Sequence, residues 1–323
     1  MRLRVVFCGL LLAAVANAYA GERSVGLDWL EIVAFAGHQT DYSGVFVYQY
    51  DKSVETSRII HVVEANGEYE KFESLDGPKR EIIHHDGIVW DYVSHKMVQV
   101  GNQQGRSRFP SLLPEQLSAL SLNYQAKLLG VERVAGYNAQ VILFQPKDNL
   151  RYTHKIWVHT DSGLLLRAAV LGDKDKVVEQ YAFTQLQIGG KIDRSWVGEC
   201  GSAELPCKGL PNLPKKSRDI MHTNSGWAAD TLPSGFRKIM EIQRLMPGKH
   251  APVTQMVFSD GFSAISIFIE PNDEDEDDVE GLSSRGAVSF YHRIVGANLV
   301  TVVGEVPPRT VMRVLDSVRY NGK

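Results

Sequence analysis

Histidine often performs acid–base catalysis or binds metals, and the sequence contains ten. His84 and His85 are adjacent, and His154 and His159 are five residues apart in one strand-like run. Side chains an odd number of positions apart on a strand point to opposite faces, so neither pair can share a ligand. The sequence has no H-E-x-x-H motif and no closely spaced Cys/His cluster. We therefore predict structural or surface histidines and no metal site.

Motifs for nucleophilic or phosphate chemistry are also missing. Gly261–Ile265 begins as a G-x-S-x-G nucleophile turn but ends in isoleucine, and no Walker or G-x-G-x-x-G loop occurs. The acidic run Asp273–Glu280 lacks the alternation and the central glycine of an EF-hand calcium loop, and a solvated loop is the simpler interpretation. A catalytic triad built from distant residues leaves no local motif. The motifs therefore identify no catalytic residue, and we expect no cofactor.

The N-terminus carries an export signal. Arg2 and Arg4 precede an unbroken apolar run, Val5–Ala16, and two overlapping A-x-A sites end at Ala18 and Ala20. This arrangement predicts a signal peptide over residues 1–20, with cleavage after either alanine. A membrane anchor is the alternative, but it requires about 20 apolar residues. We expect a mature protein that is soluble in the periplasm.

Length, charge and cysteines narrow the class of protein further. A mature chain of about 300 residues predicts two domains. The net charge of −3, with both signs interspersed, argues against nucleic acid as a partner. Signal cleavage leaves Cys200 and Cys207, which we expect to form a disulfide in an oxidising compartment. A reactive or metal-binding pair is the alternative, but the spacing is not C-x-x-C and no histidine adjoins either thiol.

Residues 21–197 are predicted to form a large, curved antiparallel sheet. Apolar residues from Leu27 to Phe35 recur at helical spacing and indicate an opening amphipathic helix, and Pro114–Tyr124 indicates a second one. Asn-Gly and Asp-Gly dipeptides between apolar runs are typical of tight hairpins. We expect strands over Val45–Tyr50, Arg58–Val63, Tyr69–Ser74, Glu81–His85, Ile88–Val93, Lys127–Val134, Ala139–Gln145, Tyr152–His159, Leu164–Leu171 and Val177–Leu186.

Residues 198–222 hold both mature cysteines and three prolines, with little apolar periodicity, and predict a linker clipped by the disulfide. Residues 223–323 are predicted to form a smaller α+β domain. Its closing helix starts at Pro307 or Pro308, with Val311, Val314, Leu315 and Val318 on one face. Strands are expected over Arg237–Leu245, Thr254–Ser259, Phe262–Ile269, Val288–Val295 and Leu299–Val303.

Aromatic side chains recur along the strands of the large domain. They include Phe46, Tyr48, Tyr50, Trp90, Tyr92, Phe144 and Trp157. Filling the core accounts for most of them. A sheet that wraps round a helix without closing also leaves an apolar concave side that can hold an acyl chain. We take Phe46, Tyr48, Trp90 and Trp157 as candidates for such a lipid cleft.

Seven short segments, spread over nearly the whole mature chain, resemble the periplasmic sigma-E regulatory proteins of the RseB/MucB family. They are Tyr42–Tyr48, Leu75–Gly77, Gly130–Gly136, Phe183–Leu186, Leu232–Phe236, Ser259–Pro271 and Val300–Pro307. Each is weak alone, and the last two together are the most specific. The resemblance implies a large unclosed β-barrel similar to lipoprotein carriers of the LolA/LolB type, joined to a smaller C-terminal α+β domain.

The resemblance also implies a function, that of a negative regulator of the sigma-E envelope stress response. Such a regulator is not an enzyme. It binds the periplasmic domain of a single-pass membrane anti-sigma factor and protects it from regulated proteolysis, and binding of lipid, lipopolysaccharide or mislocalised lipoprotein releases it. A homodimer is possible. A lipid or lipoprotein carrier without a regulatory partner is the main alternative, and an envelope hydrolase is a third.

The C-terminal domain is where we expect the protein partner to bind. The face of Met256–Pro271, which includes Phe262, is the first candidate. Tyr291 and Arg293 lie in another strand-like run, and Arg293 can pair with a carboxylate of the partner. An ordinary surface role for Arg293 is equally compatible with the sequence.

Overall fold

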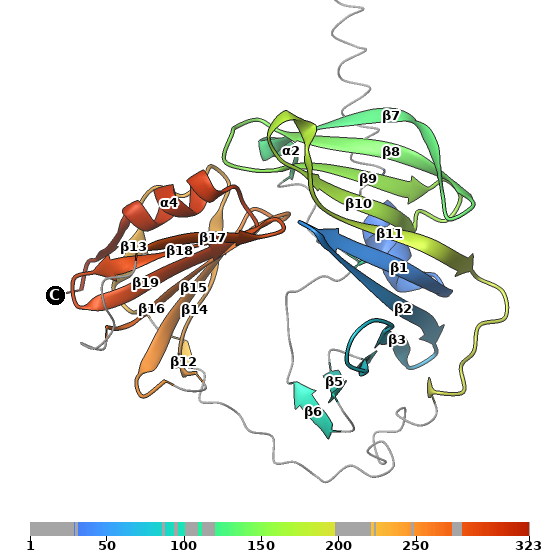
Figure 1. Cartoon of the computed structure of the whole chain (residues 1–323), viewed down its shortest axis with the longest axis horizontal. Coiled ribbons are helices and arrows are strands. Elements are labelled where there is room, and N and C mark those ends of the chain that lie inside the picture. The colour runs from blue at the N-terminus through green and yellow to red at the C-terminus, as the bar shows by residue number, and fades with distance from the viewer. Residues whose placement is uncertain are drawn as a thin grey trace, which may run out of the picture.

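The structure of the chain is a computed structural model. It is rich in β-strands, as expected from the alternation of apolar and polar residues. The structure describes residues 29, 32–85, 88–93, 96–100, 109–111, 120–197, 221–222, 224–246, 249–272 and 280–322. The predicted signal peptide, Cys200, Cys207 and nearly all of the acidic run lie outside these ranges. Figure 1 shows two β domains side by side.

The large domain consists of one antiparallel sheet. Its first six strands are β1 (Tyr42–Tyr50), β2 (Ser53–Glu64), β3 (Gly67–Ser74), β4 (Arg80–His85), β5 (Ile88–Val93) and β6 (Lys96–Val100). The other five are β7 (Tyr124–Val134), β8 (Tyr137–Pro146), β9 (Thr153–His159), β10 (Leu165–Leu171) and β11 (Val177–Ile188). A short 3₁₀ helix, Asp173–Asp175, joins β10 to β11.

The order of the strands explains the curvature seen in Figure 1. It runs β6-β5-β4-β3-β2-β1-β11-β10-β9-β8-β7, so two meanders meet where β1 pairs with β11. Phe46 lies opposite Phe183 there, and Tyr48 lies opposite Tyr181. Within the described residues β6 and β7 are the two end strands, so the sheet is an unclosed barrel. The predicted fold class is confirmed.

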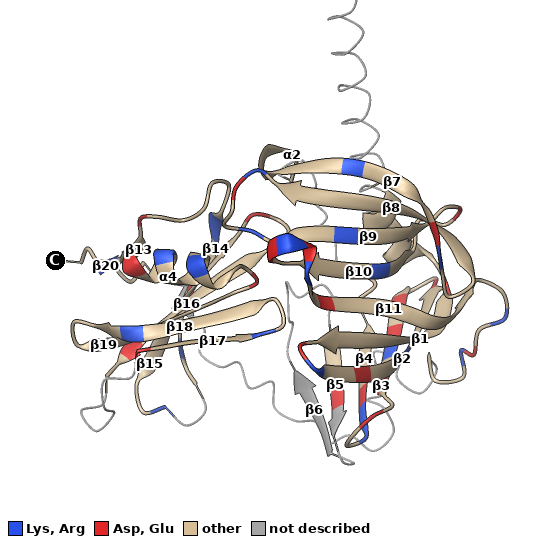
Figure 2. Cartoon of the chain, turned by 45° about the horizontal axis from the view of Figure 1, so that its top comes forward, with Lys and Arg blue, Asp and Glu red and all other residues tan. Residues whose placement is uncertain are grey.

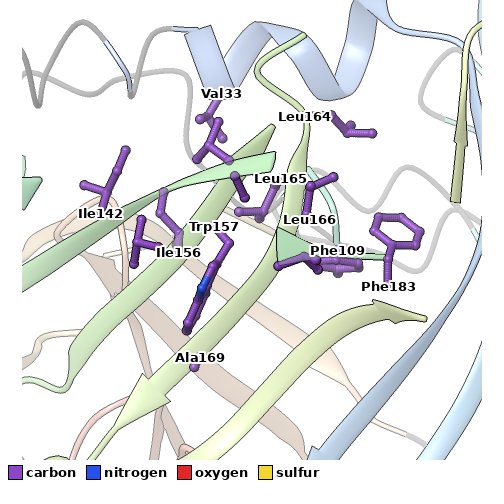
Figure 3. Close-up of a cluster of buried hydrophobic side chains, with 14 of the residues drawn as sticks. Val33, Phe109, Ile142, Ile156, Trp157, Leu164, Leu165, Leu166, Ala169 and Phe183 are labelled. Carbon is purple, nitrogen blue, oxygen red and sulfur yellow. The ribbon is translucent and has the colours of Figure 1, made fainter. Parts of the chain in front are cut away.

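The concave face of this sheet holds the main core. Ile142, Ile156 and Phe183 project from the strands, and Val33 comes from the helix over residues 32–39 (Figure 3). Each such side chain contributes about 1.5–3 kcal/mol when fully buried. The helix buries Val33 and Ala36 but leaves Phe35 61% exposed. The predicted apolar face was therefore wrong in detail, because residues 33, 36 and 37 share the side that meets the sheet.

The small domain is built on a second antiparallel sheet, in the order β12-β14-β15-β16-β19-β18-β17. Its strands are β12 (Met221–His222), β14 (Arg237–Leu245), β15 (Pro252–Ser259), β16 (Ala264–Pro271), β17 (Gly281–Arg285), β18 (Val288–Val295) and β19 (Asn298–Gly304). Helix α4 (Pro308–Asp316) covers one face and buries Val311, Val314 and Leu315 (Figure 1). Pro308 occupies the first turn, where its missing N–H costs nothing, and the predicted closing helix is confirmed. Val318, predicted on the same helix face, instead begins strand β20, because the helix ends at Asp316.

Other predicted boundaries need correction. Within Pro114–Tyr124 the structure describes helix α2 only over Leu120–Asn123, and Tyr124 begins strand β7. Strand β16 begins at Ala264 instead of Phe262, because Asp260 Oδ1 accepts the backbone N–H groups of Phe262 and Ser263 in a turn. The short strands β6, β12, β13 (Trp227–Ala229), β17 and β20 (Val318–Tyr320) were not predicted.

Candidate functional site

Aromatic rings fill the concave face of the large sheet. Phe46 on β1 has ring neighbours at 5.1 Å (Phe109), 5.9 Å (Phe72) and 6.0 Å (Phe183). Phe109 also stacks on Tyr181 at 5.5 Å. Such contacts add about 0.5–1.5 kcal/mol per pair to simple burial. The result is an apolar surface covered by the ring of Phe109, which belongs to neither meander.

Tyr48 continues this face toward the end of β1. Its ring stacks on Tyr181 at 4.3 Å, and its hydroxyl donates to Glu179 Oε2 at 3.1 Å. Burial, followed by the neighbouring Tyr181 and Glu179, raises the pKa of Tyr48 well above its usual value. The hydroxyl is therefore a fixed hydrogen-bond donor and not a base.

A third predicted cleft residue, Trp157, lies elsewhere. The register pairs Tyr48 with Tyr181, Tyr181 with Ala168 and Ala168 with Ile156, so the next residue, Trp157, points to the opposite face. There Trp157 lies 4.6 Å from Lys155 Nζ and donates from Nε1 to Glu132 at 2.7 Å. Trp90 lies in β5, and its side chain is outside the described residues. The four residues do not line one cleft.

A buried ion pair joins the two domains. Arg151 Nε of the large domain lies 2.6 Å from Asp260 Oδ2 of the small domain, and both side chains are 0% exposed. The guanidinium also contacts Asp148 and donates to the carbonyl of Ser234. Burial acts to lower the pKa of Arg151, but the hydrogen bond and charge of Asp260 outweigh it and raise the pKa. Arg151 therefore stays cationic, because Asp260 compensates its charge where it is buried.

Phe262 follows Asp260 in the same turn and packs into the large domain. Its ring stacks on His154 at 4.8 Å and meets Tyr124 at 5.2 Å and Phe144 at 5.3 Å. His154 is partly buried, its Nε2 atom is shielded from solvent, and this desolvation lowers its pKa to about 4. The predicted partner-binding residue Phe262 thus lies in the domain interface.

A second contact lies at the tip of the β17–β18 hairpin, which reaches β1 in Figure 1. The Ala287 N–H donates to Glu179 Oε2 at 3.0 Å, and the guanidinium of Arg285 lies 4.8 Å from the ring centre of Tyr50. Thr310 of α4 is buried and donates to the carbonyl of Leu150 at 2.8 Å. Two separate groups of contacts therefore fix the orientation of the small domain.

The remaining predicted partner residues lie on β18. Tyr291 is buried in the small core, and its hydroxyl bonds to Glu280. Arg293 is one-third exposed and forms an ion pair with Asp316 of α4 at 3.1 Å. Close by, Met312 and Arg313 line a shallow depression on the outer side of α4, which the sequence gave no reason to expect.

No other chemistry gathers within the described ranges. They contain no group of three His, Cys, Asp or Glu side chains that could hold a metal ion. In the same ranges, no helix has the length and apolar character needed to cross a bilayer. Charges of both signs lie scattered over both domains in Figure 2. The features that stand out are contact surfaces: a concave aromatic face and an interface of two domains.

An open antiparallel half-barrel fixed to a small α+β domain defines a two-domain protein with surfaces suited to binding. The MucB/RseB N-terminal domain family matches residues 26–200, and the MucB/RseB C-terminal domain family matches residues 221–319. The chain belongs to the MucB/RseB family.

Relatives match nearly the whole chain. The sigma factor AlgU regulatory protein MucB of Pseudomonas aeruginosa is 31% identical over 96% of this chain and 96% of its own length. The sigma-E factor regulatory protein RseB of Haemophilus influenzae is 26% identical over 96% and 95%. A crystal structure of MucB in complex with MucA(peri) superimposes with a TM-score of 0.72 at 28% identity, covering 92% of this chain and 99% of that one.

Proposed function

We propose that this protein is a periplasmic negative regulator of a sigma-E-type stress response and not an enzyme. It binds the periplasmic domain of a membrane anti-sigma factor and protects that domain from proteolysis. The observation that carries the proposal is similarity over both domains to a relative, MucB, whose crystal structure contains MucA(peri).

Protection follows from burial of the partner segment. A protease needs its substrate extended in the active site, so a segment held as a strand or helix on another protein is not cleaved. Arg293 is the first candidate contact, because its present partner, Asp316, is more than half exposed. An exposed ion pair of this kind is worth about 0–1 kcal/mol, so a partner carboxylate can replace Asp316 at little cost.

Release by lipid is the second half of the proposal. The concave face around Phe46, Tyr48 and Phe109 is aromatic, and an acyl chain would enter it by displacing the ring of Phe109, because Phe46 and Phe109 are each only 3% exposed. A ligand shifts the protein toward release only by the difference in its affinity for the two states. Lipid must therefore bind the free regulator more tightly than the partner-bound one.

The test is retention of the anti-sigma periplasmic domain on immobilised mature protein, with protease resistance of that domain as the second readout. Arg293→Glu is expected to lower retention at least tenfold. Arg319→Glu is the matched control, because Arg319 also pairs with an aspartate, Asp230 at 2.8 Å, on the surface of the same domain. Equal retention of both variants removes Arg293 from the site. If the wild type itself does not retain the anti-sigma domain, the proposed regulator function is refuted.

A lipid carrier without a regulatory partner is the second candidate, favoured by the aromatic concave face alone. The same column separates the two functions. A carrier binds acyl ligands and retains no anti-sigma domain, whereas the regulator does both.

A further inference from the structure

The contacts of Phe262 connect the small domain to the concave face of the large one. Phe144 on β8 pairs with His154 on β9, and two positions along the same strands Ile142 pairs with Ile156. Residues two apart on a strand share a face, so Phe144 and His154 continue the concave surface. The residues Tyr124, Phe144 and His154, here called the Phe262 contact site, therefore form one end of that surface.

The contact site is apolar apart from its edges. The rings of Tyr124 and Phe144 contact Phe262, and the neutral imidazole of His154 stacks on it. The Nε2 atom of this imidazole has no hydrogen-bond partner among the described residues. Phe262 belongs to the same connected core as Phe46 and Phe183. An acyl chain lying along the concave face and reaching this end would occupy the volume of the Phe262 ring.

We propose that Phe262 is an interdomain plug: an acyl ligand that extends to this end of the concave face and a docked small domain exclude each other. The proposal rests on the lipid-binding half of the proposed function and adds the residue through which lipid acts on the small domain. The coupling between lipid binding and domain docking needs no chain of intermediate residues, because the Phe262 ring belongs to the interface and also competes with the ligand.

The rest of the interface determines how strongly the plug is held. Phe262 and Asp260 belong to one turn, so withdrawal of the ring also separates Asp260 from Arg151. Both charged groups regain water on separation, which offsets part of the lost attraction. The domains therefore stay docked without ligand, and ligand binding and docking are linked as competing equilibria.

A disulfide across the interface tests the proposal directly. A Cβ placed on Gly235 of the small domain lies 2.8 Å from Asn123 Cγ of the large domain. Asn123 Cβ is one bond further, so the two Cβ atoms lie at most about 4.3 Å apart, within the range that a disulfide spans. The oxidised and reduced forms of the double variant Asn123→Cys/Gly235→Cys are then compared. Both forms carry the same substitutions, so any strain that the substitutions cause affects both equally.

Binding of the fluorescent C18 fatty acid cis-parinaric acid to the mature protein is the readout. The oxidised double variant is expected to bind the probe at least tenfold more weakly than the reduced one, whereas the wild type binds equally under both conditions. Phe262→Ala removes the plug and is expected to bind at least threefold more tightly than the wild type. Phe268→Ala is its control, because Phe268 lies on strand β16, which directly follows the Phe262 turn, and pairs with Gln255 and Thr301 within the small domain.

The outcomes separate the two proposals. Equal binding by the oxidised and reduced forms, or a Phe262→Ala variant that binds like Phe268→Ala, overturns the plug and leaves lipid binding intact. Binding of the probe by no form overturns the lipid ligand itself, and the plug with it. Retention of the anti-sigma domain is measured separately and depends on neither result.

Discussion

Replacing Arg151 by methionine should destabilise the protein far more than replacing an exposed arginine. The change leaves Asp260 charged, 0% exposed and without its cation. Breaking a buried ion pair by removing one partner costs about 3–5 kcal/mol. Arg58 provides the control, because it contacts Glu73 at 2.7 Å, nearly the distance of the buried pair, but is almost half exposed. Arg58→Met should cost about 0–1 kcal/mol.

The assay is urea unfolding of the wild type, both single variants and Arg151→Met/Asp260→Asn. The amide of asparagine keeps an acceptor for the turn N–H groups that Asp260 Oδ1 now binds, and it removes the buried charge. The free energy of unfolding of the double variant should therefore be at least about 1 kcal/mol higher than that of Arg151→Met. This is the order of magnitude of one lost charge-assisted hydrogen bond. A loss below about 1 kcal/mol for Arg151→Met, or a double variant no more stable than it, would refute the role of this pair.

Three further predictions concern single side chains. His154 has a folded-state pKa of about 4, below its ordinary value, so it contributes stability that is complete above about pH 6.5 and lost as pH falls toward 4. His154→Phe should remove about 2 kcal/mol of the difference in unfolding free energy between pH 7 and pH 5, and an unchanged difference contradicts this. Leu315→Ala should cost about 2–5 kcal/mol in urea unfolding, against less than about 0.5 for the exposed Met312→Ala. Gly235→Ala should lower stability by about 1–3 kcal/mol more than Gly296→Ala, because both have positive φ but only Gly235 faces a side chain of the other domain. Thermal unfolding of the two glycine variants measures that difference, and equal midpoints would show that the domains do not meet there.

The strands could be predicted because their signals are local. Alternation in β1, the Asp-Gly turn before β16 and the prolines before α4 each act within a few residues. The short strand β17, with the sequence GLSSR, has almost no apolar residue and is a strand because β18 pairs with it. Its existence depends on tertiary structure, which the local pattern does not encode.

The candidate site was harder to predict for the same reason. Arg151 stands in a turn-like stretch with nothing to show that an aspartate 109 positions away compensates its charge. Phe262 was predicted to contact the protein partner, whereas in the structure its ring packs against Phe144 of the large domain. Trp157 and Phe46 are both aromatic residues in strand-like runs of the sequence. Only the register of the four strands β1, β11, β10 and β9 shows that they lie on opposite faces of the sheet.

The junction between β1 and β11 also sets an order for folding. Tyr42 pairs with Ile188, so the central seam of the large sheet joins residues nearly 150 positions apart. A chain that emerges from its N-terminus can pair β1 through β6 early, but one edge of β1 stays open until β11 is available. During that interval β1, which is rich in tyrosine and valine, has an unpaired edge that can pair with a strand other than β11. The open edge of β1 must therefore be kept from wrong pairing until the second meander has formed.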